Sequence, residues 1–521
     1  MFNPKSSQFQ ISFSIIFIAA FLIWIIFSAF FGEKLPIDNG IAGDAITYFN
    51  IVSHFQKLIL PHQLPVYDIQ RLLPLFCVYV ISKIAGISSN NAHNVILLFS
   101  IYNTFLICIA IRMWWLIGEK LAWDFEAKFF AFCALFLNFC VLKSYGYEPV
   151  ATDPSAFVAG LLIYYFFIAG KKWCLLLTTL FSAFIYPMVI MLMGLCLLFP
   201  NPTQSDLNEK MQGKTSFIFY LAIFTLAVLY FILGVTAHFY TYFHPIITSI
   251  KSSGITSTKI TLILHAFEKI LFDPKNYLPI CIILISTVAL FFYFLFLLRY
   301  FYKPCLSLFH KPSMLLKTGG LFVIIIIIHH CFFLYSNGQS MGPNFGVSLP
   351  TFILNVAQDA TLFPLVFLVA HIIYFGPIIC FCIFLWKDIL KYAWYKNTGL
   401  FLLIGFYVFF CTNGESRQFT NFFPLLVVII TDILNKKNIS FSQTLIFGFT
   451  CFITSKVWLQ LNHGIWPTQL TLENIRHFPM QWVFMNIGTW LTPLTYNIDA
   501  AIALISMFFI FILFFKKQHE K

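Results

Sequence analysis

An aspartate and an arginine frame the first polar stretch of a chain that is otherwise dominated by apolar residues. Asp44 follows the first long apolar segment, and Arg71 opens the sequence Arg-Leu-Leu-Pro further along. Only 20 of the 521 residues are Asp or Glu, so a carboxylate and a guanidinium placed together at a membrane surface are conspicuous. A carboxylate can act as a general base, and a guanidinium can bind a phosphate through two parallel hydrogen bonds. The pair therefore indicates chemistry at one face of a bilayer.

Both residues also have a structural interpretation, and the sequence does not decide between the two. Polar residues such as Asn50 and His54 fall on one side of the segment after Asp44, which predicts an amphipathic helix in the outer interface. Asp44 is a good N-cap for that helix, and Arg71 is equally suited to be an interfacial anchor or an ion-pair partner of Asp68. The predicted apolar face of the helix comprises Tyr48, Ile51, Val52, Phe55 and Leu58.

Two other charged sites lie beside apolar segments. Asp153 precedes Pro154, and an Asp at the N-cap with Pro at the first helical position is a strong helix-start signal. The expected topology nevertheless places Asp153 on the same face as Asp44. Glu415 and Arg417 share a very short turn between two apolar segments. That turn favours an ion pair between them, but its arginine is also placed to face an anionic headgroup.

Metal binding has little support in the sequence. His329 and His330 are adjacent, so on a helix they point about 100° apart and make a poor pair of ligands for one ion. A single histidine such as His371 is expected to be satisfied within a helical bundle. Cys380 and Cys382 are separated by one residue, which matches neither a zinc motif nor a redox motif. No cofactor is identified with certainty, and dependence on a divalent metal stays open.

The composition predicts an all-α, polytopic membrane protein. Hydrophobic residues make up 60% of the chain, charged residues make up 10%, and the mean hydropathy is +0.85. A soluble protein of this length needs far more polar surface. The net charge of +12 does not indicate nucleic-acid binding, because basic residues of membrane proteins are mostly retained on the cytoplasmic side. We therefore expect no nucleic-acid partner.

The apolar segments predict about 14 membrane spans, at fewest about 12, within a single integral-membrane domain that covers residues 1–521. Pro187 divides the run 173–199 into two short helices that meet at the outer face beside Tyr186. The short segment 71–86 is placed as a juxtamembrane helix on the outer side. The predicted spans are 11–31, 94–116, 128–143, 155–169, 173–186, 188–199, 216–235, 278–298, 319–335, 362–386, 398–411, 418–434, 441–456 and 498–515.

This arrangement puts both termini in the cytoplasm, because Lys and Arg then gather on the inner side. It collects the irregular, functional surface on the outer side. Acids are almost absent from mid-span positions, whereas ion-coupled transporters usually carry ionisable groups near the midplane. That distribution favours interfacial catalysis over transport. The large outer loops are 32–93, 236–277, 336–361 and 457–497.

In the order and sidedness of these features, the chain resembles the GT-C superfamily of integral-membrane glycosyltransferases. The resemblance covers most of residues 1–200 and the region 398–434. Elsewhere only general hydrophobicity is shared. The motifs that carry it are GDAITYF from Gly43, RLLPLF from Arg71, TDPSAFVAGLLIYYF from Thr152, the Pro-broken hairpin at Tyr186-Pro187, and GESRQFTNFFPLL from Gly414.

Members of this superfamily typically transfer a sugar from a polyprenyl phosphate on the outer side of the membrane. Once its negative charge is neutralised, a prenyl phosphate leaves without being protonated, so the reaction needs no general acid. One carboxylate then suffices as the general base for the acceptor hydroxyl. Direct displacement inverts the configuration of the anomeric carbon. The chain departs from the family in having Ala45 after Asp44, where many members have a second acid, and Tyr186 where an arginine is common. The site that the resemblance implies comprises Asp44 and Asp153 as catalytic carboxylates, and Arg71, Arg417, Glu415 and Tyr186 as substrate-binding residues.

The implied partners are a polyprenyl-phosphate-linked sugar donor, a lipid or glycan acceptor, and the surrounding membrane lipids. The expected outer loops contain no Asn-x-Ser/Thr sequence, which suits a bacterial inner (plasma) membrane. A polysaccharide polymerase or ligase is a weaker hypothesis, because only Arg71, Arg417 and Arg476 are expected outside. The sequence is also compatible with a transporter or flippase of a lipid-linked glycan, with a structural assembly subunit, and with a superfamily member that has lost its activity.

Overall fold

The computed structural model confirms the all-α class, since the residues that it describes form helices and no strand. The described residues are 7–36, 40–41, 43–59, 64–199, 277–309, 312–336, 356, 360–462 and 493–516. The predicted span 216–235 lies outside them, as do nearly all of the predicted outer loops 236–277 and 336–361 and most of 457–497.

The helices fall into two groups along the chain. The N-terminal group comprises α1 (Ser7–Phe31), α2 (Asp44–Ser53), α3 (Phe55–Ile59), α4 (Val66–Ile69), α5 (Leu72–Ala85), α6 (Ala92–Lys120), α7 (Phe125–Phe136), the π-helix η2 (Cys140–Ser144), α8 (Tyr145–Tyr147), α9 (Asp153–Ile168), α10 (Lys172–Ser182) and α11 (Val189–Leu197). The C-terminal group comprises α15 (Tyr277–Phe309), α16 (Pro312–Tyr335), α18 (Val366–Phe375), α19 (Ile378–Phe384), α20 (Trp386–Lys396), α21 (Thr398–Phe410), the 3-10 helix η4 (Ser416–Phe419), α22 (Phe423–Asn435), α23 (Phe441–Thr454) and α26 (Pro493–Phe514).

Within the described part of the chain, three helices are long and apolar enough to cross a membrane: Gln10–Phe31, Ala92–Lys120 and Leu494–Phe514. A fourth is counted if α7 and the η2–α8 segment, which are bent by 51° relative to each other, form one span. Ile16 and Phe31 of α1 are exposed, which suits a surface in contact with lipid tails. These apolar helices support a membrane-embedded protein, and the total of about 14 spans stays a prediction.

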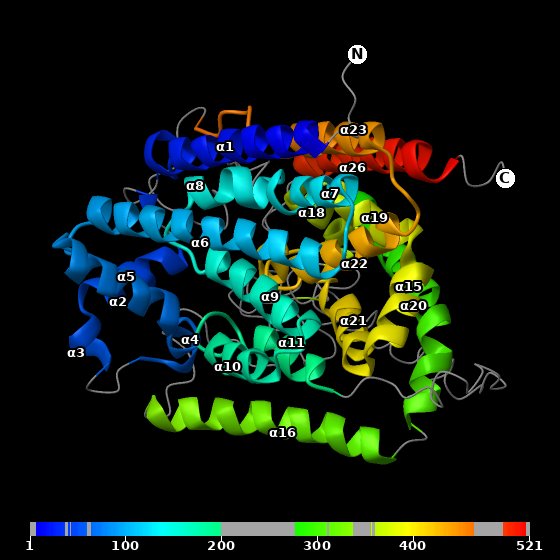
Figure 1. Cartoon of the computed structure of the whole chain (residues 1–521). Helices are drawn as coiled ribbons and strands as arrows, with labels where there is room; N and C mark the ends of the chain where they lie inside the picture. Colours follow the sequence, from blue (N-terminus) through cyan, green and yellow to red (C-terminus); the bar gives the residue numbers. More distant parts are fainter. Residues whose placement is uncertain are drawn as a thin grey trace, which may run out of the picture.

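Helix α9 lies at the centre of the bundle. It packs against α6, α10, α11 and α22, and most of its residues from Asp153 to Tyr164 are buried. A helix that is apolar on every side is stable only where neighbours cover it. Figure 1 shows α2 to α5 gathered at one end of the bundle, away from the N-terminal end of α1 and the C-terminal end of α26. Helix α16 runs along the face opposite to α1, α23 and α26.

The amphipathic segment predicted after Asp44 is present as α2, which continues after a turn at His54 into the short α3. Its predicted polar side, including Asn50 and His54, is exposed. Most of the predicted apolar face is buried, and the buried members are Tyr48, Ile51, Val52 and Phe55. The alternation of burial confirms that this helix lies along a surface with one side packed inward.

The N-cap interpretations of two aspartates are wrong by one position. Gly43, with a φ of 59°, has the cap position of α2, and Asp44 is its first helical residue. Thr152 likewise precedes α9, and Asp153 is the first residue of that helix. Both aspartates still lie at helix N-termini, where the helix dipole stabilises negative charge. Their carboxylates nevertheless bind other side chains, as described below.

Prolines break the helices at two places. The predicted break at Tyr186-Pro187 is confirmed, because α10 ends at Ser182 and α11 begins at Val189. The predicted span 362–386 is not one continuous helix, since α18 ends before Gly376 and α19 begins after Pro377. Gly376 has a φ of 83°, and proline lacks the N–H that would continue the helical ladder.

A close backbone approach at Gly160 fixes α9 against the connection between η4 and α22. A Cβ added to Gly160 would lie 2.0 Å from the carbonyl oxygen of Asn421. Because the obstacle is main chain, no rotation of a side chain can relieve the contact. The absence of a side chain at Gly160 therefore sets the distance between the helix that begins at Asp153 and the turn that carries Arg417.

Replacing Gly160 by Ala should destabilise the protein by about 1–3 kcal/mol, the usual effect of overpacking a close contact. The matched control is Gly319→Ala in α16, where an added Cβ meets no atom within 4 Å. This control should be neutral or stabilising by about 0.5–1 kcal/mol, because alanine restricts the unfolded chain. Unfolding of the purified protein in detergent measures both, and equal stability of the two variants would contradict the close-approach argument.

Candidate functional site

The carboxylate of Asp44 is held by two residues that are distant in sequence. The hydroxyl of Tyr67 donates a hydrogen bond to Asp44 Oδ2 at 2.8 Å. The Nη2 atom of Arg417 lies 3.7 Å from the same oxygen. Among the described residues, no hydrogen bond involves the other oxygen, Oδ1. One oxygen of Asp44 is thus oriented by the protein, and the second is available to a ligand.

Arg417 connects three parts of the site. Its Nε forms an ion pair with the Glu415 carboxylate, which confirms the contact expected from the short turn. Its Nη2 is directed to Asp44, and its backbone carbonyl lies 3.1 Å from the hydroxyl of Tyr186. Gln418 donates a further hydrogen bond to the second oxygen of Glu415. Arg417 therefore pairs with Glu415 in its own turn and also reaches the Asp44 carboxylate. A local ion pair and an interaction of Arg417 with an anionic group outside the turn are thus compatible.

Arg71 lies at the start of α5 with its side chain almost fully buried. Its guanidinium stacks on Tyr67, 3.7 Å from the ring centroid, and also faces Tyr186 at 5.8 Å. The Nη1 atom donates to the backbone carbonyl of Tyr67 at 3.0 Å. The buried Nε has no hydrogen-bond partner among the described residues. An orphan donor on a buried cation is costly and is suited to an anionic ligand.

Asp153 and Tyr186 form the third part of the site. The Tyr186 hydroxyl lies 3.0 Å from Asp153 Oδ1, and Asp153 is buried at the start of α9. Tyr186 belongs to the proline-broken connection between α10 and α11. This connection is tied to α5 by a backbone hydrogen bond of 2.8 Å from Leu73 to Phe184. The broken hairpin therefore brings Tyr186 between Arg71 and Asp153.

All six residues that the sequence singled out thus lie in one contact network. It links Asp44 to Arg417, Arg417 to Glu415 and Tyr186, and Tyr186 to Asp153 and Arg71. Their roles in binding or catalysis remain predictions, because proximity alone does not assign them.

Sequence reasoning gave Tyr67 no role, although it forms the hydrogen bond to Asp44. Its spacing from Arg71 was the available signal, because residues i and i+4 face each other on helical turns. Asp68, next in the chain, is buried as well. Burial raises the pKa of Asp68 to about 6, and the nearby charge of Arg71 opposes the rise.

Glu148 is a further acid of this site. It follows α8, and it interacts electrostatically with Arg417, Asp153 and Asp44. Burial raises the pKa of Glu148 to about 7; Arg417 opposes this rise, and the carboxylates of Asp153 and Asp44 reinforce it. A carboxyl group whose pKa lies near neutrality can hold or release a proton under physiological conditions.

The described residues contain no group of three or more His, Cys, Asp or Glu side chains arranged to hold a metal ion. The Arg417 guanidinium lies beside one oxygen of Asp44, Oδ2. His371 is satisfied within the bundle as predicted, with Nδ1 at 2.9 Å from Ser416 Oγ and Nε2 at 2.8 Å from the Cys411 carbonyl. Among the described residues, Arg71 and Arg417 are the cationic side chains of this contact network.

No family model, curated protein or solved structure matches the chain. Function is therefore inferred from the residues and their geometry.

The raised pKa of Glu148 predicts a stability that falls with increasing pH. Between the ordinary pKa of 4.5 and the folded value of about 7, the folded protein binds more protons at Glu148 than the unfolded chain. The free energy of unfolding should therefore decrease across this interval, by up to about 3 kcal/mol. Glu148→Gln should reduce this slope, because the amide does not titrate, whereas Asp68 with its raised pKa of about 6 still contributes at the lower pH values. Unfolding in detergent from pH 4 to pH 8 measures the slope, and parallel curves for the two proteins would refute the assignment.

Proposed function

We propose that the chain is a membrane glycosyltransferase that moves a sugar from a polyprenyl-phosphate carrier to a lipid or glycan acceptor. The observation that carries the proposal is the meeting of Asp44, Arg71 and Arg417 in one network. It combines an oriented carboxylate with two guanidinium groups at the end of the helical bundle where α2 to α5 gather. A base and an anion-binding pair are the two components that displacement of a phosphate leaving group requires.

Asp44 is the general base of the proposed reaction. The acceptor hydroxyl attacks the anomeric carbon and forms the new glycosidic bond, while its proton passes to the Asp44 carboxylate. The bond between the anomeric carbon and the phosphate oxygen breaks, and the electron pair leaves with the prenyl phosphate. Because attack and departure take place on opposite faces, the anomeric configuration is inverted. Tyr67 and Arg417 fix Oδ2, which leaves Oδ1 to accept the proton.

Arg71 and Arg417 bind the phosphate. The stacked, buried guanidinium of Arg71 has an Nε that no described residue accepts from, so an anion there would satisfy this donor. Arg417 is held by Glu415 and is therefore preorganised before the donor arrives. Preorganised cations stabilise the charge that develops on the leaving phosphate more effectively than mobile ones.

The proposed setting is a bacterial inner membrane with both termini in the cytoplasm and the site on the outer side. Two observations support the separation of the site from the described ends of the first and last helices. The N-terminal end of α1 and the C-terminal end of α26 lie away from α2 to α5 in the bundle (Figure 1). The apolar, exposed surface of α1 ends at Phe31, shortly before the polar segment that leads to Asp44.

Transport of a lipid-linked glycan is the second candidate, and Asp499 is the observation that favours it. Asp499 lies two turns into α26, is fully buried, and has no hydrogen-bond partner for either oxygen among the described residues. Lys456 is nearby and also buried. Ionisable groups inside apolar helices often mark transport pathways. Transport that requires Asp499 and persists in Asp44→Asn would make this candidate the leading one.

Asp44→Asn should abolish base catalysis while preserving the shape of the side chain. We expect kcat to fall by about 100- to 10,000-fold with little change in binding of the donor. The assay follows transfer from a panel of polyprenyl-phosphate hexoses and pentoses by the reconstituted protein. Asn50→Ala, on the exposed side of the same helix, is the matched control and should retain full activity. Unimpaired transfer by Asp44→Asn would exclude Asp44 as the base.

Arg71→Lys should keep the positive charge but lose the ring stacking and the planar donor set. We expect kcat/KM for the polyprenyl-phosphate donor to fall about tenfold to hundredfold, mainly through KM, as a charged hydrogen bond to phosphate is lost. Lys83→Arg, a charge-conserving change at an exposed residue of α5, is the matched control and should leave the kinetics unchanged. Equal kinetics for Arg71→Lys and the wild type would mean that Arg71 is only an interfacial anchor.

A further inference from the structure

A pocket of about 330 Å³ lies between the C-terminal part of α1 and the turn that follows α23. Its walls are aromatic, and the aromatic lining residues are Trp24, Phe27, Phe31, Tyr147 and Trp458. Three of these residues belong to α1 and follow each other at spacings of three and four, so they form one stripe on the helix. Trp24, Phe27, Phe31 and Trp458 are exposed beyond the pocket. The pocket is therefore continuous with the apolar surface of α1.

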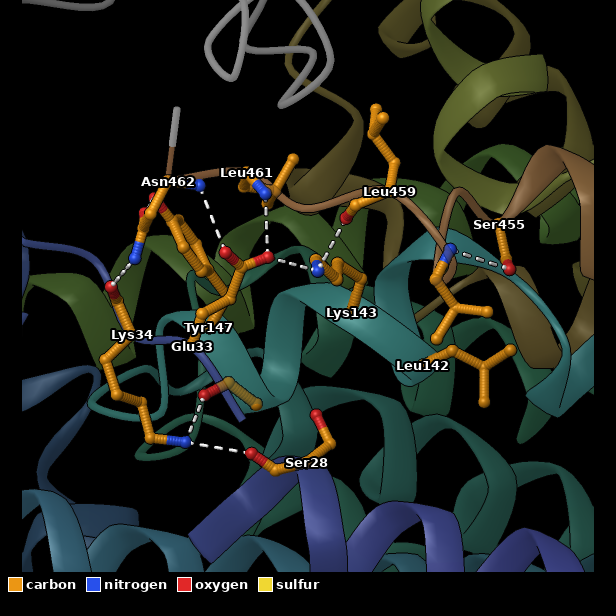
Figure 2. A network of polar contacts seen from close by, with 12 residues as sticks. Ser28, Glu33, Lys34, Leu142, Lys143, Tyr147, Ser455, Leu459, Leu461 and Asn462 are labelled. Atoms are coloured by element: carbon orange, nitrogen blue, oxygen red, sulfur yellow. Dashed lines mark hydrogen bonds and ion pairs between the residues drawn. The ribbon is translucent and has the colours of Figure 1, made fainter. Parts of the chain in front are cut away.

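The floor of the pocket is polar and organised around Glu33. Figure 2 shows the Glu33 carboxylate in the middle of a network that includes Lys143, Leu461 and Asn462. Lys143 forms an ion pair with Glu33, and the backbone N–H groups of Leu461 and Asn462 donate to its two oxygens at 2.7 and 3.0 Å. Although burial by itself raises the pKa of Glu33, these donors lower it below the usual value. Glu33 is thus ionised and paired.

Hydrogen bonds on both sides hold this floor rigid. Tyr147 donates from its hydroxyl to Asn462 Oδ1 at 2.8 Å, and the Asn462 amide donates to the Lys34 carbonyl at 2.8 Å. The Lys34 ammonium turns the other way and donates to the carbonyl of Ser28 (Figure 2) and to that of Ala29, both in the last turn of α1. The helix dipole of α1 also stabilises the Lys34 ammonium, because a cation near the C-terminus of a helix faces the negative end of the dipole. The pocket is therefore formed before any ligand arrives.

The chemistry of the lining selects a ligand with two unlike parts. The aromatic stripe on α1 suits an acyl chain, because it merges with the lipid-facing surface. The floor carries no net charge, since Glu33 and Lys143 neutralise each other, and it therefore gives little preference for an anionic headgroup. Gln460, which is exposed in the lining, adds a neutral amide with donors and an acceptor. A sugar ring has an apolar face, which can stack on the indole rings of Trp24 and Trp458. Its hydroxyl groups can form hydrogen bonds with polar groups such as the amide of Gln460.

Two consecutive residues connect the pocket with the site around Asp44. Tyr147 lines the pocket, and the next residue, Glu148, lies close enough to Arg417 and Asp44 for their charges to act on it. This connection along the chain is the reason to relate binding in the pocket to the acceptor side of the reaction.

We propose that this pocket binds a lipid with an uncharged glycosyl headgroup, with the acyl chain along the aromatic stripe of α1 and the sugar over the Glu33–Lys143 floor. The binding itself is independent of catalysis. Its use as the acceptor subsite rests on the proposed glycosyltransferase function.

Binding of monoglucosyl diacylglycerol to the purified full-length protein, measured by native mass spectrometry, tests the proposal. Diacylglycerol and phosphatidylglycerol with the same acyl chains are the comparison lipids. Trp24→Ala and Trp458→Ala should weaken binding of the glycolipid at least about tenfold, as expected on loss of an aromatic anchor. Trp115→Ala is the matched control, since Trp115 and Trp24 are both 37% exposed and only Trp24 lines the pocket.

Gln460→Leu is a second, exposed variant that should leave the fold intact. It should reduce the preference for the glycolipid over diacylglycerol while preserving the binding of the acyl chain. Equal binding of all three lipids, a preference for phosphatidylglycerol, or equal losses in Trp24→Ala and Trp115→Ala would overturn the proposal. Asp44→Asn should bind the glycolipid as the wild type does, because Asp44 does not line the pocket. If the wild type binds the glycolipid but transfers no sugar to it, the proposed function is refuted and the assignment of the pocket stands.

Discussion

Charge compensation in an apolar chain is the constraint on which the rest of this structure depends. Arg417 illustrates it, because its guanidinium reaches Glu415 and Asp44 while its carbonyl lies beside the Tyr186 hydroxyl. Arg71 and Asp153 of the same network are buried, and a buried charge without a partner costs several kcal/mol, on the order of the total stability of a domain. Helices that carry these groups must therefore meet where the charges can be paired. Arg417 and its partners tie α2, the α10–α11 connection and the η4 turn to one another.

Interrupted helices present these polar groups without exposing main chain to lipid. The break at Pro187 places Tyr186 beside Asp153, and the 51° bend between α7 and α8 leads to Tyr147 and Glu148. Irregular backbone at a membrane is tolerated only where it is buried in protein or faces water. The connection between α7 and η2 is buried, and the connection between α10 and α11 is half-buried.

Several features could be predicted from the sequence because they depend on local patterns. The amphipathic helix after Asp44, the break at Pro187 and the ion pair between Glu415 and Arg417 all follow from spacing within a few residues. The division of 362–386 at Gly376 was missed, because hydropathy does not distinguish one long apolar helix from two short ones. The N-cap positions were displaced by one residue, which local propensity does not resolve.

The sequence by itself determined that the chain is helical and apolar, and it identified the acids and arginines that are hard to accommodate in such a chain. Only the tertiary structure decided that these residues meet. Asp44 and Arg417 are far apart in the chain, and the contact between them depends on how α9 packs at Gly160 and on where the broken hairpin places Tyr186. Long-range packing of this kind depends on shape and close backbone approach. These are properties of the whole bundle, and no local sequence pattern contains them.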